Sequence, residues 1–468
     1  MKQLKVKSEK LKVKSGKLKV ESEKLEMISG KLKVNSETLK GQTKELERTK
    51  KQSVFHFSFF IFHLKGALIF IFSLLTFHSV SGQQLQTFIE EGLANNPKIQ
   101  IFEFRYQVAK EKVNEVNTLP NTQIGVGYFV SEPETRTGAQ RFKVSAKQML
   151  PSFGSITARE NYVASLADAV YEDVVIVKRK LVASISQSYY NLYALKAKQI
   201  ILVENRSLLK TYEELALTSV EVGKASAVDV LRLQMRQNEL QQLEQVLEQD
   251  YLAEQTALNK LLNRDSYIEI SMDSELTIPL ENIQINSENL ALHPELLKYE
   301  KLYESVEKSE LLNQKEGNPM FGFGLDYIAV SERPNVNFND NGKDIVMPMV
   351  RISIPIFNTK YKSKTKQNEL HQKEINFQKQ DKRNRLETLL DKAVKKRTSA
   401  RISYDTQTKN LKQAKDAETI LVKSYETGTI DFNDVLDIQE LQLKFQMNQV
   451  ESIKTYYLQT TIINYLTN

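Results

Sequence analysis

The chain of 468 residues carries 65 Lys and Arg against 58 Asp and Glu, and it contains no Cys. The absence of Cys excludes disulfide scaffolds, thiolate metal sites and Cys nucleophiles. Residues 1–52 hold 16 basic and 7 acidic side chains, whereas residues from 83 onward hold 48 basic and 51 acidic ones, so a nucleic-acid-binding main body is excluded. Only His293 and His371 follow residue 82, so we expect no multi-histidine metal site.

The first segment, residues 1–52, is a repeat with Leu at every seventh position from Leu4 to Leu46. A seven-residue period is typical of a coiled coil. The second apolar residue of each unit follows only two positions later, which places it about 200° around a helix, on the opposite side. We interpret the segment as a low-complexity extension without functional structure. A real coiled coil is the alternative, and translation from Met27 would omit half of the repeats.

Residues 53–82 have the pattern of a signal peptide. Lys50, Lys51 and Lys65 precede the uncharged run Ala67–Phe77, and the small residues Ser81 and Gly82 follow it. A basic region, a short apolar core and a small-residue cleavage site define such a signal. We therefore expect the mature protein to begin near Gln83. A retained N-terminal anchor is the alternative, which N-terminal sequencing of the membrane form would detect.

Glycine and proline divide the remaining chain into two halves, 83–286 and 287–468. Gly223 is the only glycine between Ser155 and Glu316, and Gly428 is the only one after Lys343. Because these residues are the strongest breakers of regular structure, the spacing predicts two long helical hairpins that turn at Gly223 and Gly428.

The two halves also resemble each other, which indicates an internal repeat. Asn96-Pro97 recurs as His293-Pro294, and Ile124-Gly-Val-Gly recurs as Phe321-Gly-Phe-Gly. The turn glycines are each followed by an Asp-Val-Leu sequence, which begins at Asp229 in the first half and at Asp434 in the second.

Each half contains a segment, about 121–150 and about 319–357, in which apolar residues alternate with small or polar ones. This alternation predicts a hairpin of two strands of about ten residues, a length that suits tilted strands in a membrane. A membrane barrel needs at least eight strands, and open edges in lipid leave backbone groups unpaired. We therefore expect several chains to pool their strands: two, three or four copies would give eight, twelve or sixteen.

From Gln83 to Asn468 the chain resembles the TolC family of outer-membrane factors. The resemblance rests on Leu93-Ala-Asn-Asn-Pro97, on Leu150-Pro-Ser-Phe-Gly154 after the first hairpin, on Ile354-Pro-Ile-Phe-Asn358 after the second, and on the two turn glycines. It implies a mainly α fold in which four strands per chain join a trimeric twelve-stranded outer-membrane β-barrel, continuous with a periplasmic α-helical tunnel of coiled-coil helices.

The resemblance implies a function as well: a passive exit duct of a tripartite efflux pump or of a type I secretion system. Its cargo would be small toxic compounds, drugs or metal ions. The expected partners are two further copies of the chain, a periplasmic adaptor (membrane fusion protein) and an inner-membrane pump, without nucleic acid. We expect no enzymatic activity, catalytic residue, cofactor or bound metal, because the sequence has no nucleophile, metal-ligand or phosphate-loop pattern.

The turns of the two hairpins are the expected adaptor-docking tip. The positions that the resemblance assigns to this tip are Val222, Gly223, Thr427, Gly428 and Thr429. The plainer interpretation, which is compatible with docking, is that the two glycines simply terminate helices.

The resemblance also assigns a pore gate to Asp434, Asp437 and Tyr425. The two aspartates are three residues apart, so they share one face of a helix. Asp434 also follows Asp431 at the spacing of a helix cap with an acidic third residue, so capping is an alternative role for it. Ile430 stands where the family has an arginine, so a closed-state lock through that arginine is not expected here.

Two structural alternatives remain open. The first is a periplasmic or secreted coiled-coil protein without a pore. The second is an adaptor subunit, but an adaptor would have one helical hairpin between β-rich halves, whereas this chain has two hairpins of similar size.

Overall fold

The computed structural model describes residues 80–224, 226–272, 275–280 and 287–468. The chain divides into two compact units, Met1–Val80 and Ser81–Asn468, and the second contains the fold described below. The expected extension 1–52 and all but the last three residues of the expected signal 53–82 lie outside the described residues. No described helix is both long and apolar enough to cross a membrane.

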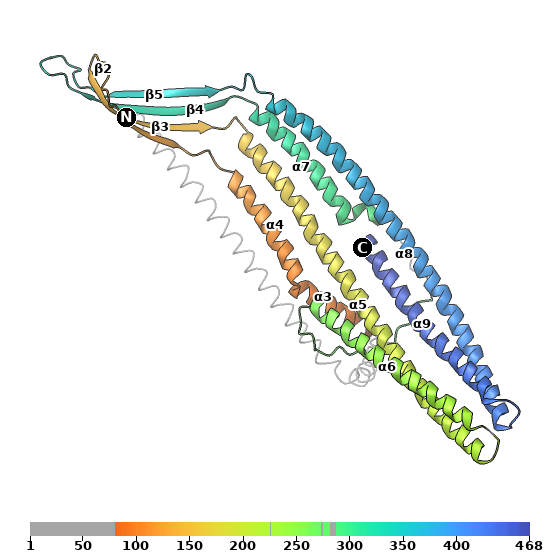
Figure 1. The fold of residues 1–468 in the computed structure, drawn as a ribbon. Helices are drawn as coiled ribbons and strands as arrows, with labels where there is room; N and C mark the ends of the chain where they lie inside the picture. Colours follow the sequence, from red (N-terminus) through yellow and green to blue (C-terminus); the bar gives the residue numbers. More distant parts are fainter. Residues whose placement is uncertain (1–79, 225, 273–274, 281–286) are drawn as a thin grey trace, which may run out of the picture. The chain divides into compact units, whose positions relative to one another are not determined.

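The first half begins with two short helices and continues, after its strands, with a long helical hairpin (Figure 1). Asn96 is the N-cap of the second short helix, because its side chain accepts a hydrogen bond from the amide of Lys98, and Pro97 occupies the first helical position. The helices of this half are α3 (Val80–Asn95), α4 (Pro97–Val116), α5 (Ser155–Glu221) and α6 (Ala227–Leu261).

The second half repeats this plan, as its sequence predicts. His293 takes the place of Asn96 as N-cap, and Pro294 takes the place of Pro97. The long helices α5 and α8 each have 67 residues. The helices of this half are η2 (Ser287–Leu292), α7 (Pro294–Glu316), α8 (Lys360–Glu426) and α9 (Phe432–Thr467).

The strands form one antiparallel sheet in the order β1-β3-β4-β5, with the two-residue β2 also paired to β3. The hairpins of the two halves thus join along β3 and β4. The edge strands β1 and β5 have no partner on their outer side among the described residues. The strands are β1 (Gln123–Tyr128), β2 (Glu134–Thr135), β3 (Gly138–Leu150), β4 (Met320–Ser331) and β5 (Ile345–Ser353). The fold class is confirmed, and β2 is the one strand that the sequence pattern did not predict.

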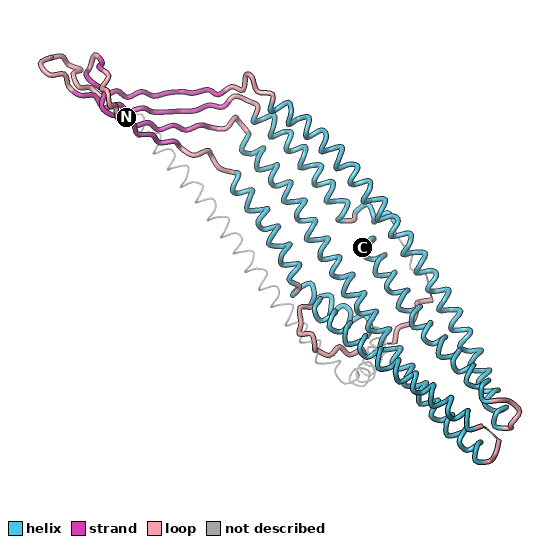
Figure 2. Tube along the Cα trace, viewed as in Figure 1, coloured by secondary structure: helices cyan, strands magenta, loops and turns pink. Residues whose placement is uncertain are grey.

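The helices pack side by side below the strands, and α5 contacts α4, α6, α7 and α9 (Figure 2). Leu233, Leu240 and Leu247, which repeat at seven residues, are at most 9% exposed and pack against α5 in a core that includes Leu202 and Leu209. A second core, around Ile185 and Leu258, joins α5 and α6 to α3 and α4. The seven-residue spacing therefore marks the seam of an antiparallel hairpin.

Candidate functional site

The sheet has one apolar face and one polar face. The strand register aligns Val126, Val144, Tyr327 and Val346 in a single cross-strand row, and the rows above and below it on this face are also apolar except at Gln148. The side chains are open to the surroundings: Val126 is 77% exposed and Val350 69%. A contiguous exposed apolar face of this size is typical of a surface that contacts lipid.

The opposite face consists mainly of small, polar and flexible side chains, with Ile328 and Ile345 as apolar exceptions. Gly125, Gly127, Gly322 and Gly324 lie on it, together with the ion pair between Lys143 and Asp326. Because successive strand residues point to opposite faces, the alternation in the sequence produces this segregation directly. It is the pattern of a membrane strand with one side to lipid and the other to a water-filled interior.

The two hairpin turns have the same backbone geometry. Gly223 and Gly428 adopt left-handed φ angles of 72° and 74°. The amide after each glycine donates to the carbonyl five residues earlier, Lys224 to Ser219 at 2.8 Å and Thr429 to Ser424 at 3.0 Å. These are the hydrogen bonds of a Schellman motif, which requires a residue that tolerates positive φ.

All five residues expected at the docking tip lie in these turns and are exposed. Val222 is 63% exposed, so an apolar side chain is presented to solvent at the end of the first hairpin. The hydroxyls of Thr427 and Thr429 both donate to the carbonyl of Ser424, at 2.9 and 2.8 Å, and so help to close the second turn. The turns therefore present a hydrogen-bonded backbone and the apolar side chain of Val222.

Asp434 and Asp437 lie on the exposed face of the first turns of α9, and neither forms an ion pair with a residue that the structure describes. Asp431 is the N-cap of α9, and its side chain accepts from the amide of Asn433 at 2.8 Å. The matching first-half helix has a complete capping box between Ser226 and Asp229. At the start of α9, by contrast, no hydrogen bond from the Asp431 amide to the Asp434 side chain is described. The N-cap of α9 is therefore formed by Asp431 alone.

The side chain of Tyr425 is buried inside its hairpin. Its ring is 6% exposed and packs edge-on against Phe432, with 4.8 Å between ring centroids. Burial raises the pKa of its hydroxyl, which faces Ser219 without a hydrogen bond of ordinary geometry. An aromatic ring next to a tight turn is better packed inside the hairpin than in water, and the gating role expected for Tyr425 stays a prediction. Ile430 is likewise packed against this core.

Arg232 occupies the first-half position that corresponds to Asp437. Its guanidinium donates to the side chain of Asn433, next to Asp434, and so links α6 to α9 near the tip. Farther from the turn, Arg236 of α6 lies 4.0 Å from Glu440 of α9. The two hairpins are thus joined by polar contacts just behind the exposed aspartates.

Comparison with known proteins agrees with this geometry. Residues 88–264 match the family described as Outer membrane efflux protein. Over these residues the chain is similar to the outer membrane efflux protein family. The family and the solved structures that match are outer-membrane channel proteins, not enzymes. No curated protein sequence matches the chain.

Solved structures of outer-membrane channels share the fold. The channel CusC superposes with a TM-score of 0.68 at 15% identity, over 82% of this chain and 92% of its own. VceC from Vibrio cholerae gives 0.65 at 16% identity, over 82% and 96%. The open state of MtrE from Neisseria gonorrhoeae gives 0.64 at 16% identity, over 82% and 88%.

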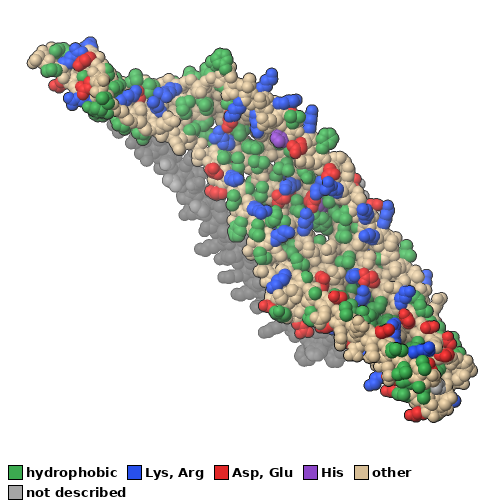
Figure 3. Space-filling model, in the orientation of Figure 1, with side chains coloured by type: hydrophobic (Ala, Val, Ile, Leu, Met, Phe, Trp, Pro, Cys, Tyr) green, Lys and Arg blue, Asp and Glu red, His purple; other side chains and the backbone are tan. Residues whose placement is uncertain are grey.

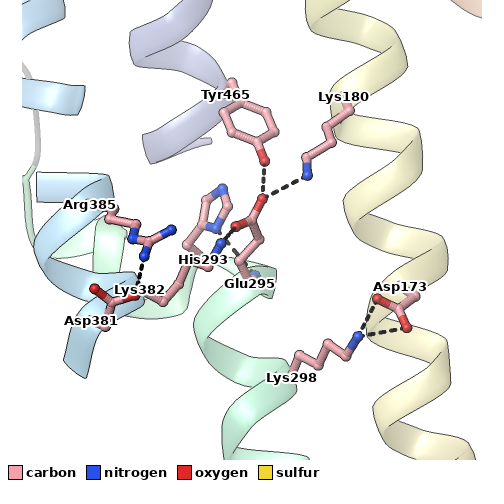
Figure 4. Close-up of polar contacts among 9 residues, drawn as sticks. All are labelled: Asp173, Lys180, His293, Glu295, Lys298, Asp381, Lys382, Arg385 and Tyr465. Carbon is pink, nitrogen blue, oxygen red and sulfur yellow. Dashed lines mark hydrogen bonds and ion pairs between the residues drawn. The ribbon is translucent and has the colours of Figure 1, made fainter. Parts of the chain in front are cut away.

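One polar cluster of the protein was missed by sequence reasoning. Glu295, at the start of α7, is bound by three other helices (Figure 4): Lys180 of α5 at 3.0 Å, Lys382 of α8 at 2.8 Å and the Tyr465 hydroxyl of α9 at 2.7 Å. Burial opposes ionisation, but the hydrogen bonds from Lys382, Tyr465 and Lys180 outweigh it and lower the pKa of Glu295 to about 2. Only the His293-Pro294 repeat signal pointed to this region.

His293 lies beside Glu295 and is expected to make the stability of the protein sensitive to acid. It is 1% exposed, and its Nδ1 accepts from the amide of Glu295 at 3.3 Å. Burial lowers its pKa to about 4, Glu295 opposes this, and Arg179 and Lys180 add to it. The neutral ring is therefore the folded form. The unfolded chain binds the proton first as the pH falls below about 6.5, so stability is lost between about pH 6.5 and 4.

Replacing His293 by Asn, the residue of the first repeat, is expected to flatten this dependence. Asn keeps the capping role without a titratable group, so up to ~3 kcal/mol of acid destabilisation would disappear. Thermal midpoints of the detergent-solubilised protein between pH 7 and 3 provide the measurement. The loss below pH 4.5, which comes from Glu295, should remain in His293→Asn. Equal pH slopes in both proteins above pH 4.5 would show that His293 is not the source.

Proposed function

We propose that three copies of the chain close into a ring whose strands form one twelve-stranded barrel and whose helices form a periplasmic tunnel, the exit duct of a tripartite efflux pump. The observation that supports this most directly is the two-faced sheet with two open edges. A free edge in lipid costs several kcal/mol for each unpaired backbone group, whereas pairing β5 of one copy with β1 of the next removes every edge.

The helices support the same closure. In the upper half of the helical region the order is α4, α5, α7 and α8, so α4 and α8 lie at opposite borders. Each carries an exposed apolar row: Ile101, Phe104 and Val108 on α4 are 51–62% exposed, and Leu370 and Phe377 on α8 are 56% and 77% exposed. If α4 of one copy contacts α8 of the next, the same contact repeats from copy to copy. Such a head-to-tail contact gives a closed ring when the rotation between copies closes. The family resemblance selects three copies.

The function can be tested in cells that lack this protein. Their accumulation of a fluorescent efflux dye should rise, and the protein supplied in trans should lower it again. Normal dye accumulation together with loss of a secreted protein would instead assign the duct to type I secretion. Normal accumulation and normal secretion would contradict the proposal.

We propose that the tip turns dock the periplasmic adaptor. Val222→Glu places a charge on the exposed apolar patch without removing a buried contact, so co-purification of the adaptor should fall while the yield of the assembled protein is unchanged. Tyr267→Glu, at an 89% exposed loop residue outside the turns, is the matched control. Equal adaptor recovery with both variants would argue against docking at this tip.

Asp434 and Asp437 are proposed as an acidic ring at the periplasmic mouth. Six carboxylates around one pore would favour cations, because low-dielectric walls focus their field. Asp437→Asn should lower the cation preference in planar bilayers, most visibly at low salt, at little cost in stability because Asp437 has no capping role. Asp434→Asn should also weaken the start of α9, by a few tenths to ~1 kcal/mol. Unchanged ion selectivity in the Asp434→Asn/Asp437→Asn double variant would contradict the acidic ring. The only remaining role of Asp434 would then be to stabilise the start of α9.

A further inference from the structure

The polar face of the sheet carries more positive than negative charge. Four of its residues are charged, Lys143, Lys147, Asp326 and Arg351. The carboxylate of Asp326 is almost fully buried and is paired with Lys143. Lys147 and Arg351 have no acidic partner among the residues that the structure describes, so each chain contributes two uncompensated cations to this face.

Both cations point from the polar face and lie at neighbouring levels. A Cβ placed on Gly324 would be 3.5 Å from Cγ of Lys147, so the lysine stem lies across this glycine. Arg351 pairs with Gly322, two residues along β4 and so ~7 Å farther toward the helices. Arg351 is exposed and Lys147 half-buried. Gly324 leaves room for the Lys147 stem, whereas the space beside Gly322 is taken by Met149.

The basic character continues where the strands meet the helices. From Arg351 to Lys366 the chain contains five basic residues and no acidic one, and Lys360, Lys362 and Lys366 are exposed. Figure 3 shows blue Lys and Arg side chains on the displayed face from the strands to the upper ends of the helices. Only Lys366 among these lysines has a described acidic partner, Glu369 at 2.7 Å.

We infer that Lys147 and Arg351 form a basic zone inside the barrel, just above the tunnel, which favours the passage of anionic solutes such as organic carboxylates, sulfates and phosphates. The inference rests on the proposed ring, in which three copies would place six cations around one lumen. The water-filled lumen keeps these cations charged, and the surrounding lipid focuses their field. The charge of this zone is opposite in sign to that of the acidic mouth. A solute in the duct would therefore pass a negative ring at one end and a positive zone at the other.

The test is the K⁺ to Cl⁻ permeability ratio of the purified full-length protein in planar bilayers, from reversal potentials near 0.1 M KCl, where the Debye length is ~10 Å. Lys147→Gln/Arg351→Gln should raise this ratio roughly twofold or more. The same pair of substitutions should do so in an Asp434→Asn/Asp437→Asn background, where the acidic mouth no longer masks the effect. Lys147→Arg/Arg351→Lys, which keeps both charges, should leave the ratio unchanged.

The outcomes separate this inference from the proposed function. Channels of normal conductance whose ratio does not change with the Gln substitutions in the Asn background would overturn the basic zone and leave the duct intact. A change of equal size in the charge-conserving pair would overturn it too, because altered shape would then be the cause. If the unsubstituted protein formed no channels, the ring itself would be refuted.

Discussion

Val126→Arg is expected to abolish assembly of the protein in the outer membrane. Val126 lies in the middle row of the apolar face of the sheet and is 77% exposed in the isolated chain. An Arg on the lipid face at mid-depth costs about 2–4 kcal/mol, and a ring of three chains incurs this cost three times. Heat-resistant oligomers in the outer-membrane fraction should therefore be strongly reduced, with monomer or degraded protein in their place.

Gly127→Arg is the matched control, one residue along the same strand on the opposite face. A Cβ at Gly127 would have no atom within 4 Å, and its φ angle is not positive, so a side chain fits there without strain. In the lumen the guanidinium stays hydrated. Assembly of Gly127→Arg should therefore be near normal. Equal assembly of the two variants, or the reverse order, would show that the faces have been assigned wrongly.

Glu295→Ala should cause a large loss of stability for a change at a polar residue of the helical region. The substitution removes the acceptor of three hydrogen bonds from three helices and leaves the Tyr465 hydroxyl and two ammonium groups without it. Removal of one member of a buried polar cluster typically costs several kcal/mol. The Lys180 side chain is 56% exposed and can be hydrated, so we expect a loss of about 2–4 kcal/mol, measured as a lower denaturation midpoint above pH 5.

Glu300→Ala serves as the control on the same helix. Glu300 also bridges α7 to α8, through Lys379 at 2.7 Å, but its side chain is 50% exposed. An exposed ion pair contributes at most ~1 kcal/mol. If the two alanine variants were equally stable, burial of the Glu295 cluster would have no energetic consequence.

The arrangement of helices and strands could be predicted from the sequence because its signals are local. Gly223 and Gly428 interrupt otherwise continuous helical segments, and the alternation around Val126 and Phe323 has the period of a strand. Side-chain direction follows from that period, so the two faces of the sheet follow as well. The strand order β1-β3-β4-β5 was harder to predict, because the pairing of β3 with β4 joins residues that are far apart in the sequence.

The polar clusters could not be predicted, since they depend on where four helices meet. Glu295 is one of many acidic residues on α7, and nothing in its neighbourhood along the chain marks it as buried. The burial of Tyr425 could not be predicted either, because packing against Phe432 decides where the ring lies. The exposure of Asp434, Asp437 and the tip residues was easier to predict, because exposure at a turn follows from local geometry.

The mass of the intact protein in detergent, measured by native mass spectrometry, tests the shared barrel most directly. Four strands with two open edges predict an assembly of several chains, and the family resemblance sets their number at three; Val126→Arg should shift the assembly toward single chains. A stable single chain that keeps its full strand content in detergent would contradict the account, because its edges would then need no partner.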